Sequence, residues 1–378
     1  MRIVMTGGGT GGHIYPALAI ANRFVKEDPE TKVLYIGDSN CMESTIVPNA
    51  GYEFRGVPAE EVNRKNILKL FKTGVKNIEG IHQARKLMSE FRPDIVIGTG
   101  GFVSFPVIVA GHSLGAKCYF QEQNAFPGLA NKMLERYASK VFLGFEAASC
   151  FFRQPEKHIV SGNPVRAEFF EADREEAREK LGISEDEFVI LSFGGSLGAG
   201  KINDVIYDIM KQLNGEKRVR LFFGTGRAYY DKVMEKIGEE GLEIHDNILI
   251  KPYIEDMVTY LAASDLMVSR AGALTVAEAC ACGRASILVP SPNVTGNHQY
   301  YNAKEIADHG AAVLIEEKDF DFDIMMKQVV RFLNDREALQ EMADNAKKIG
   351  DTDACGIIYK GIMDDLTDKV QTDERKQD

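Results

Sequence analysis

TGGGTGGHIYPALAIA (residues 6–21) joins a strand-like run, RIVM at residues 2–5, to a helix-like pattern through five closely spaced glycines. Its spacing, G-x-G-x-x-G, fits the fingerprint of loops that bind dinucleotides. His13 and Pro16 stand where such loops usually continue into a helix of small residues, so we expect them to interrupt the start of the helix. The stretch therefore predicts a phosphate-binding loop after a buried strand, without deciding whose phosphate it binds.

The second half of the chain repeats this arrangement in FGGSLGAGKINDVI (193–206). Apolar runs alternate with amphipathic stretches along the whole chain, a pattern typical of parallel strands joined by helices. We predict strands at residues 2–5, 32–37, 94–100, 117–121 and 140–145, and again at 188–195, 218–226, 247–253, 265–272, 284–290 and 311–317. The predicted fold class is α/β, with two Rossmann-like domains whose parallel sheets face each other across a cleft.

The domain boundary is expected near Pro164, because proline blocks regular strand pairing and an acidic helix start follows it. We therefore expect an N-terminal domain at residues 1–163 and a C-terminal domain at residues 164–350. A helix at about 351–370 is expected to pack back on the first domain. The acidic tail, residues 364–378, is expected to fray.

The 378 residues suit two domains, and contents of 44% hydrophobic and 27% charged residues are those of a globular protein. We expect no signal peptide, because strand-like residues begin at position 2. We expect no transmembrane helix, because no apolar run approaches about 18 residues. Six cysteines form no CxxC pair, which predicts buried thiols in a reducing cytoplasm.

A net charge of −11 argues against nucleic-acid binding. The charge is unevenly divided, since residues 1–163 carry 19 Lys and Arg against 15 Asp and Glu, whereas the remainder carries 26 against 41. Only the first half is therefore expected to meet an anionic partner or surface.

The segment VNRKNILKLFKTGVKNI (62–78) contains no acidic residue. As a helix it would place an apolar face beside basic side chains, the layout of a segment that lies on an anionic bilayer. An ordinary helix with a solvated basic face is the alternative, and the segment alone favours it. The residues that would make the membrane contact are Arg64, Lys65, Ile67, Lys69, Leu70, Phe71 and Lys72.

The loop GGSLGAGK (194–201) nearly matches a P-loop, but Ile202 stands where a Ser or Thr must coordinate magnesium. We therefore expect a helix N-terminus that holds a diphosphate with the help of Ser196 and without a metal. The segment DFDFD (319–323) resembles a metal-binding DxD, but its position before an apolar-periodic stretch favours helix capping. No metal or other cofactor is expected, since no other cluster has metal-ligand spacing.

Two acidic residues are candidates for a ribose. Asp38 lies at the end of the second predicted strand, where it could bind the ribose of a dinucleotide held by the first glycine loop. That arrangement would indicate a nicotinamide-dependent oxidoreductase. Glu278 lies three residues after Thr275 in SRAGALTVAEACACG (269–283), so both share a face near a helix N-terminus. An acid that only stabilises the first turns of that helix is the plainer alternative. His13 is either a structural hydrogen bonder or a general base at the mouth of the cleft.

Eight stretches together resemble one family in their order and spacing. They are GGGTGGHIYPALA (7–19), IGTGGFVSFP (97–106), QEQNAFPGLANK (121–132), SGNPVR (161–166), GGSLGA (194–199), YIEDM (253–257), SRAGALTVAEA (269–279) and NHQYYNA (297–303). The family is MurG, the bacterial N-acetylglucosaminyltransferases that convert lipid I to lipid II in peptidoglycan synthesis. The resemblance covers residues 1 to about 350.

This resemblance implies the GT-B fold, a membrane-facing acceptor domain at the N-terminus and a C-terminal domain that binds UDP-N-acetylglucosamine (UDP-GlcNAc). It implies that the uracil meets Ile254, the ribose Glu278, and the diphosphate Ser196, Ala273, Leu274 and Thr275 with Arg166 close by, while the sugar meets Asn124, Gln299, Thr10, Gly11 and Gly12. The family usually has Gln where Leu197 stands, so a side-chain contact there is not expected. His13 is the expected catalytic base.

The implied partners are UDP-GlcNAc, lipid I, the anionic inner leaflet of the cell membrane and other cell-wall synthesis proteins. The implied location is the cytoplasmic face of that membrane. Three alternatives stay open at this point: another GT-B glycosyltransferase with a lipid acceptor, a nicotinamide-dependent oxidoreductase, and a sugar-nucleotide binding protein without activity.

Overall fold

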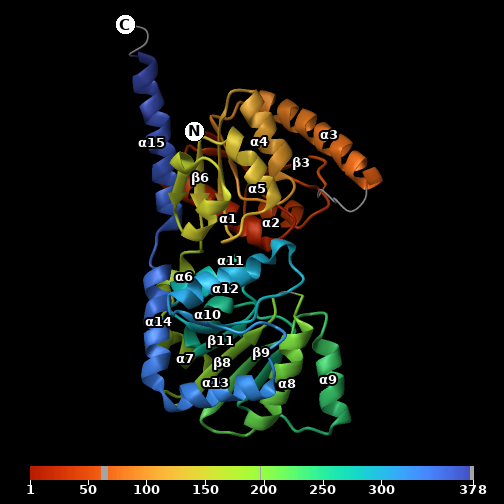
Figure 1. Cartoon of the computed structure of the whole chain (residues 1–378), viewed down its shortest axis with the longest axis vertical. Helices are drawn as coiled ribbons and strands as arrows, with labels where there is room; N and C mark the ends of the chain where they lie inside the picture. The colour runs from red at the N-terminus through yellow and green to blue at the C-terminus, as the bar shows by residue number, and fades with distance from the viewer. Residues whose placement is uncertain (61–66, 196, 375–378) are drawn as a thin grey trace. The chain divides into compact units, whose positions relative to one another are not determined.

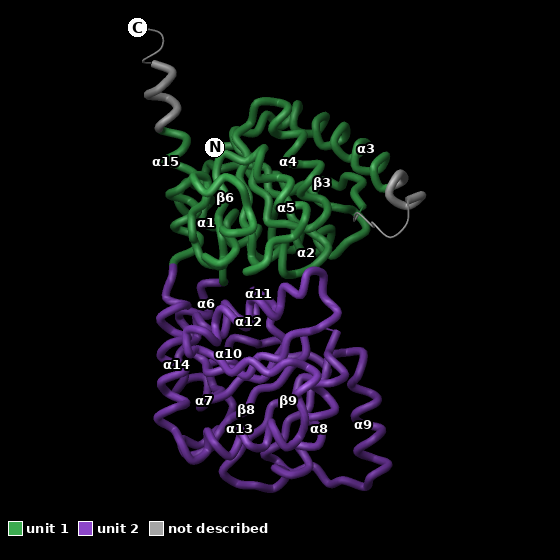
Figure 2. Tube along the Cα trace, in the orientation of Figure 1, with its two compact units in different colours: residues 1–165, 353–378 green, residues 166–352 purple. Residues whose placement is uncertain are grey.

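The computed structural model describes residues 1–60, 67–195 and 197–374, with only the backbone described at 67–72 and 368–374. The chain divides into two compact units (Figure 2). Unit 1 comprises Met1–Val165 and Asp353–Asp378, and unit 2 comprises Arg166–Thr352.

Unit 1 contains a parallel sheet with the strand order β3-β2-β1-β4-β5-β6-β7 (Figure 1). The strands are β1 (Arg2–Thr6), β2 (Lys32–Gly37), β3 (Glu53–Gly56), β4 (Ile95–Gly98), β5 (Lys117–Glu122), β6 (Lys140–Leu143) and β7 (His158–Val160). The five strands predicted in this half are confirmed. The sequence analysis missed β3 and β7, because these edge strands are short and partly exposed and so lack a continuous apolar run.

Helices cover both faces of this sheet. They are α1 (Gly11–Glu27), α2 (Glu43–Asn49), α3 (Ile67–Phe91), α4 (Ser104–Ser113), α5 (Leu129–Leu134) and α15 (Ala354–Glu374). Ile3 and Met5 of β1 pack with α1 and α15 on one face, whereas Val4 packs with α4 on the other. This division follows from the alternation of side chains along a strand.

The last helix completes the core of unit 1. Ile358 and Ile362 of α15 are fully buried, and Asp365 accepts from Lys117 Nζ (2.7 Å) and Tyr119 Oη (2.8 Å) of β5. The expectation that residues 364–378 fray is therefore wrong for the beginning of this tail, and the helix continues to Glu374.

Unit 2 contains a second parallel sheet with the order β10-β9-β8-β11-β12-β13. Its strands, all predicted, are β8 (Phe188–Phe193), β9 (Val219–Gly224), β10 (Ile248–Lys251), β11 (Leu266–Ser269), β12 (Ala285–Leu288) and β13 (Ala312–Leu314). Its helices are α6 (Glu168–Glu171), α7 (Arg174–Leu181), α8 (Gly200–Leu213), α9 (Tyr230–Glu239), α10 (Met257–Ala263), α11 (Ala273–Ala281), α12 (His298–Asp308), α13 (Phe322–Asn334) and α14 (Arg336–Gly350). Thus the predicted α/β class with two parallel sheets is confirmed.

The helix after the first glycine loop is not interrupted as expected. It begins at Gly11 and runs through His13 and Pro16. Proline at this position removes only the bond to the carbonyl of Gly12, and Gly12 is exposed, so water can reach that carbonyl.

Two further local expectations have different outcomes. Asp321 caps α13 by accepting from Ile324 N–H (2.8 Å), and Phe320 is fully buried, which confirms the capping interpretation of DFDFD. The expectation that every cysteine is buried is wrong for Cys150, which is exposed in a 3-10 turn at Glu146–Phe151. Cys41 and Cys355 are half-buried.

Candidate functional site

The predicted glycine loops follow the strands at which each sheet reverses its order. In unit 1 the order reverses between β1 and β4, which lead into the loops 7–12 and 99–101. In unit 2 it reverses between β8 and β11, which lead into the loops 194–199 and 270–272. Ligands of open α/β sheets bind at such reversals, outside the carboxyl ends of the strands. Each unit therefore has one candidate site.

Short contacts fix the two loops of unit 1 to each other. Gly8 N–H donates to Gly100 O (3.3 Å), and Thr99 Oγ1 donates to the carbonyl of His13 (2.7 Å). Gly101 has a φ of +79°, and a Cβ there would lie 2.3 Å from Gly8 O. This approach therefore requires glycine at 101, and it fixes the loop that leads to His13.

A buried carboxylate engages the first glycine loop. Glu43 is fully buried, and it accepts from Gly9 N–H (3.1 Å) and from Asp38 N–H (3.0 Å) through different oxygens. A Cβ at Gly8 would lie 2.1 Å from Glu43 Oε1, so glycine at 8 makes room for the carboxylate. Sequence reasoning missed Glu43, because it lies 34 residues from Gly9 and belongs to no recognisable spacing.

Asp38, on which the nicotinamide alternative depended, is engaged locally. It is buried, and its Oδ1 accepts from the backbone N–H (2.8 Å) and the side-chain amide (3.1 Å) of Asn40. A dinucleotide site needs free loop amides for the pyrophosphate and a free acid for the ribose. Since Glu43 occupies the N–H of Gly9 and Asn40 occupies one oxygen of Asp38, the structure disfavours that arrangement in unit 1.

His13 lies half-buried in the first turn of α1, after Thr10, Gly11 and Gly12. Its Nδ1 lies 3.0 Å from Gly8 O and 3.5 Å from Thr10 Oγ1. A carbonyl oxygen only accepts, so the neutral imidazole carries its proton on Nδ1 and its lone pair on Nε2. In this tautomer Nε2 is the atom that can take a proton from a hydroxyl group.

A second buried carboxylate, also missed from the sequence, organises the QEQN segment. Glu122 accepts from the backbone N–H (2.9 Å) and the side-chain amide (3.1 Å) of Asn124 through Oε1. Its other oxygen accepts from Asn131 Nδ2 (2.8 Å) and Gly128 N–H (3.2 Å). The predicted sugar-binding residue Asn124 is thereby oriented by its neighbour.

In unit 2 the helices after β8 and β11 begin without a side-chain cap from any described residue. The N-cap positions are Ala199 for α8 and Gly272 for α11, neither of which has an accepting side chain. By contrast, Asp256 and Asp321 cap α10 and α13 by accepting from first-turn N–H groups (3.3 and 2.8 Å). The first-turn N–H groups of α8 and α11, the latter at Ala273, Leu274 and Thr275, have no partner in the described part of the chain. They form a suitable setting for an anion.

Glu278 lies partly buried on the second turn of α11, on the same face as Thr275. Burial raises the pKa of its carboxyl to about 7, and the guanidinium of Arg166 opposes that shift. Arg166 is exposed, with its guanidinium 4.9 Å from the centre of the Phe169 ring. Among the described residues the carboxylate has no hydrogen-bond donor, so its oxygens remain available to hydroxyl groups of a ligand.

The two remaining predicted donor residues lie in the same unit. Ile254 is buried in the loop between β10 and α10, and its backbone N–H and carbonyl make no hydrogen bond to described residues. Gln299, in the first turn of α12, accepts from Ser291 N–H (2.9 Å) through Oε1. Because a backbone N–H only donates, this bond fixes the side-chain amide and leaves its NH₂ to donate elsewhere.

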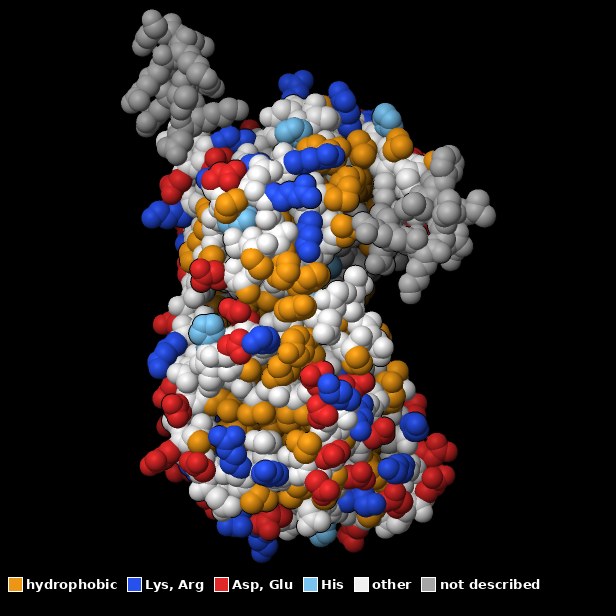
Figure 3. Space-filling model, in the orientation of Figure 1, with side chains coloured by type: hydrophobic (Ala, Val, Ile, Leu, Met, Phe, Trp, Pro, Cys, Tyr) orange, Lys and Arg blue, Asp and Glu red, His pale blue; other side chains and the backbone are white. Residues whose placement is uncertain are grey.

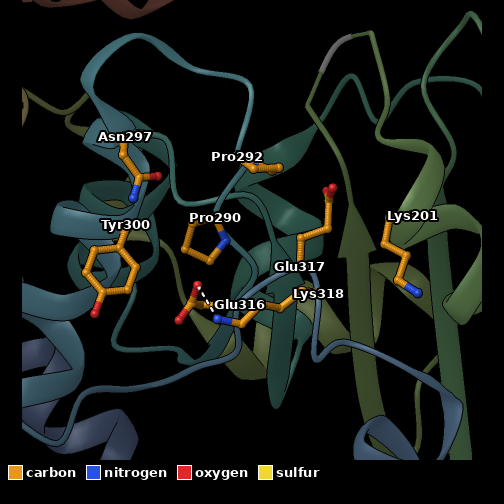
Figure 4. Close-up of a pocket in the computed structure, with 8 residues that line it drawn as sticks. All are labelled: Lys201, Pro290, Pro292, Asn297, Tyr300, Glu316, Glu317 and Lys318. Carbon is orange, nitrogen blue, oxygen red and sulfur yellow. Dashed lines mark ion pairs between the residues drawn. The ribbon is translucent and has the colours of Figure 1, made fainter.

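Unit 2 also contains a pocket of about 490 Å³ (Figure 4). It is lined by Lys201, Pro290, Pro292, Asn297, Tyr300, Glu316, Glu317 and Lys318. Figure 4 shows Asn297 and Tyr300 on one side of the pocket and Lys201 on the other. Gln299 is not one of the lining residues, but Tyr300, which follows it in α12, is.

Arg270, another residue that sequence reasoning missed, fastens one wall of this pocket. Its Nη1 donates to the carbonyls of Val289 (3.1 Å) and Pro290 (3.2 Å), and its Nη2 pairs with Glu317. The sequence analysis identified the motif SRAG, which contains Arg270. It did not identify the hydrogen-bond partners of Arg270, because they lie in other loops.

Several predicted residues lie outside the described parts: Ser196, Arg64 and Lys65. Ile67, Lys69, Leu70, Phe71 and Lys72 lie in α3, with only their backbone described. Further along α3, Val75 and Ile78 are 53% and 57% exposed. On the face drawn in Figure 3, acidic side chains are abundant on unit 2, whereas basic and hydrophobic ones lie side by side on unit 1. No helix within the described ranges combines the length and the apolar composition needed to cross a bilayer.

Comparison with known families gives matches in both units. Residues 3–143 match the glycosyltransferase family 28 N-terminal domain, and residues 189–355 match the glycosyltransferase family 28 C-terminal domain.

Two curated relatives carry the same name, UDP-N-acetylglucosamine--N-acetylmuramyl-(pentapeptide) pyrophosphoryl-undecaprenol N-acetylglucosamine transferase. The protein of Acetivibrio thermocellus is 41% identical over 370 residues, which is 98% of this chain and 100% of its own. Transferase 1 of Bacillus cereus is 42% identical over 369 residues, again 98% and 100% of the two chains.

Solved structures share the fold. The crystal structure of MurG from Acinetobacter baumannii matches with a TM-score of 0.76 and 28% identity, over 96% of this chain and 99% of that one. UDP-GlcNAc 2-epimerase from Neisseria meningitidis, bound to UDP-GlcNAc, matches with a TM-score of 0.67 over 96% of this chain and 100% of that one. At 14% identity, the second similarity concerns the fold alone.

Proposed function

The chain belongs to glycosyltransferase family 28, and we infer that it is the N-acetylglucosaminyltransferase that converts lipid I to lipid II. It transfers N-acetylglucosamine from UDP-GlcNAc to undecaprenyl-diphospho-N-acetylmuramyl-pentapeptide. The observation that carries this conclusion is an identity of 41–42% with enzymes of that name over nearly the whole length of both chains.

We propose that unit 2 binds the donor. The open N-termini of α8 and α11 support this assignment, since two helix N-termini supply N–H groups and positive dipoles to a diphosphate without a metal. Glu278 would accept from the ribose hydroxyls, Ile254 would meet the uracil through its backbone, and Gln299 would donate to the sugar. Ser196 and Arg166 would contact the diphosphate.

We propose that His13 is the catalytic base on the acceptor side. Its Nε2 takes the proton as the acceptor's 4-hydroxyl oxygen attacks the anomeric carbon in line. The new glycosidic bond forms while the bond from that carbon to UDP breaks, with inversion, and UDP leaves with the electron pair. Thr10, Gly11, Gly12 and Asn124 would bind the sugar around this centre. The dipoles at the diphosphate stabilise the charge that develops on the leaving group.

An assay of UDP release with a lipid I analogue tests both the activity and the base. The purified protein should release UDP only when donor and acceptor are both present, and absence of release would overturn the transferase assignment. His13→Ala should lower turnover about 100-fold or more. His82→Ala, at an exposed position of α3, is the matched control and should change little. Near-normal turnover of His13→Ala would remove His13 from the mechanism.

We propose that residues 62–78 bind the anionic inner leaflet at the cytoplasmic side of the cell membrane. Five basic and no acidic residues in this segment support the proposal, as do the exposed Val75 and Ile78 in its described part. The lipid-anchored acceptor gives the enzyme a reason to dock there, beside other cell-wall synthesis proteins.

Sedimentation with vesicles that contain anionic lipid tests this contact. Changing Lys65, Lys69 and Lys72 to Glu should weaken binding more than tenfold, since each basic residue near such a surface contributes about 1 kcal/mol. Changing Lys26, Arg85 and Lys86 to Glu, at exposed positions of unit 1 outside this segment, is the charge-matched control and should leave binding nearly unchanged. Equal binding of the triple variant and the wild type would exclude the segment as the membrane contact.

A further inference from the structure

The buried side chain of Gln123 has one atom that the described structure leaves without a partner. The residue is 2% exposed, and its Nε2 donates to Thr99 O (2.7 Å), Gln121 Oε1 (2.5 Å) and Gln121 O (3.2 Å). Because these carbonyls only accept, they fix the amide with its nitrogen towards them. Gln123 Oε1 is buried and has no hydrogen-bond partner. An unsatisfied buried acceptor is unfavourable and therefore needs a reason.

Gln123 Oε1 and the ring of His13 both lie beside Gly100, which has no side chain. A Cβ at Gly100 would lie 3.5 Å from Gln123 Oε1, 3.1 Å from His13 Nε2 and 2.8 Å from His13 Cδ2. The oxygen and the Cδ2–Nε2 edge of the imidazole thus share the space that the missing side chain of Gly100 leaves open. Gly100 has a φ of +105°, so its backbone also favours glycine.

We propose that Gln123 is a positioning residue for the catalytic base, and that its Oε1 stabilises the imidazolium form of His13. The proposal rests on the proposed role of His13 in proton transfer. While His13 is neutral, the lone pair on Nε2 and the carbonyl oxygen of Gln123 are both acceptors and gain nothing from each other. Once Nε2 has taken the hydroxyl proton, the Nε2–H and Cδ2–H edge is positive and meets a carbonyl dipole.

The stabilisation is therefore larger after proton transfer than before it, which is the condition for a contribution to kcat. Gly8 O also stabilises the imidazolium, because it accepts a hydrogen bond from Nδ1–H on the other side of the ring. Two neutral carbonyl groups would thus take the place that a carboxylate holds behind the histidine of many hydrolases. Being buried, Gln123 does not touch the substrate and acts only through His13.

Steady-state kinetics of Gln123→Met test the proposal, with Gln121→Met as the matched control. Gln121 is fully buried in the same network, where its Nε2 donates to Asn163 Oδ1 (2.9 Å) and its Oε1 accepts from Gln123 Nε2 (2.5 Å), but it does not border the space above Gly100. Gln123→Met should lower kcat about tenfold, move the acid limb of the pH–kcat profile to lower pH and leave the donor KM unchanged. Gln121→Met removes one acceptor of Gln123 Nε2 but keeps the carbonyls of Thr99 and residue 121, which still hold the amide, so it should leave the acid limb in place.

The same substitution in a His13→Ala background separates the two hypotheses. If Gln123 acts through His13, Gln123→Met should lower the residual turnover less than twofold there. A tenfold loss in both backgrounds would overturn the role of Gln123 and leave that of His13 intact. Near-normal turnover of His13→Ala alone would overturn the base itself.

A second variant covers the case in which Gln123→Met does not fold, as judged by circular dichroism. Gln123→Asn keeps an amide and withdraws its oxygen by one methylene, so it should move the acid limb in the same direction. An unmoved acid limb in a folded variant would overturn the proposal.

Discussion

The carboxyl edges of the two sheets use similar glycine loops in opposite ways. In unit 1 the chain's own carboxylates engage the loops, since Glu43 accepts from Gly9 N–H and Glu122 from Asn124. In unit 2 the first-turn N–H groups of α8 and α11 and the carboxylate of Glu278 have no hydrogen-bond partner among the described residues. The first turn of α1 likewise has no side-chain cap, so the two units differ in the carboxylates that engage the loops of unit 1 and in the carboxylate of Glu278, which has no donor among the described residues. These unused groups, rather than glycine spacing, support the proposed nucleotide site in unit 2.

Gly100→Ala should produce the largest effect, because the added methyl group would press directly on the ring of His13. The new Cβ would lie 2.8 Å from His13 Cδ2 and displace the ring, so turnover should fall about 100-fold. Gly115→Ala is the control, since Gly115 also has a positive φ, +83°, but nothing lies within 4 Å of its Cβ position. Both variants carry backbone strain of about 1 kcal/mol. Equal turnover of the two would mean that His13 is not displaced or not needed.

Glu43→Gln tests whether the contacts of Glu43 stabilise the fold of unit 1 without affecting the binding of UDP. Glutamine has one accepting oxygen where Glu43 uses two, so one of the N–H groups of Gly9 and Asp38 would face an NH₂ group. The free energy of unfolding should fall by about 2 kcal/mol, measured by urea denaturation. The exposed Glu53→Gln is the control. The affinity for UDP should not change, and a marked loss would contradict the separation of the two sites.

The sequence predicted the central strands correctly, and it singled out the proposed donor residues of unit 2 more readily than the buried contacts of unit 1. Buried parallel strands are continuous apolar runs, so their positions could be read directly, whereas the edge strands β3 and β7 could not. Glu278 could be singled out as a candidate because it lies within two turns of a helix start. Glu43 and Gln123 were not, because their partners Gly9 and Thr99 lie 34 and 24 residues away and meet them only through the sheet topology.

Glu278→Gln tests whether the carboxylate of unit 2 that has no donor among the described residues binds the ribose. Loss of the carboxylate should raise the Kd for UDP about tenfold, measured by isothermal titration, since hydrogen bonds to a charged group are lost. The exposed Glu239→Gln, on α9, is the control. An unchanged Kd would contradict the ribose assignment.

The same variant should be more stable than the wild type at pH 8. The folded pKa of Glu278, about 7, is above its ordinary value of 4.5, so the folded state binds more protons between these values. The contribution of Glu278 to stability therefore falls as the pH rises from about 4.5 to about 7. Above that range the buried charge costs about 1 kcal/mol after allowance for its partial exposure, and Glu278→Gln removes this cost. A variant less stable at pH 8 would mean that the carboxylate has a structural partner.

Asp321→Ala should have the smallest effect. It tests whether Asp321 only caps the N-terminus of α13 or also binds a metal. As the N-cap of α13, Asp321 contributes about 1 kcal/mol to the free energy of unfolding, and turnover should be the same with or without a chelator. Asp323→Ala is the control, because a DxD metal site needs both acids, whereas the cap uses Asp321 alone. If both variants lost turnover and excess divalent metal restored it, DFDFD would be a metal site. The carboxylate of Asp321 would then bind a ligand, and α13 could no longer be contrasted with the uncapped helices α8 and α11.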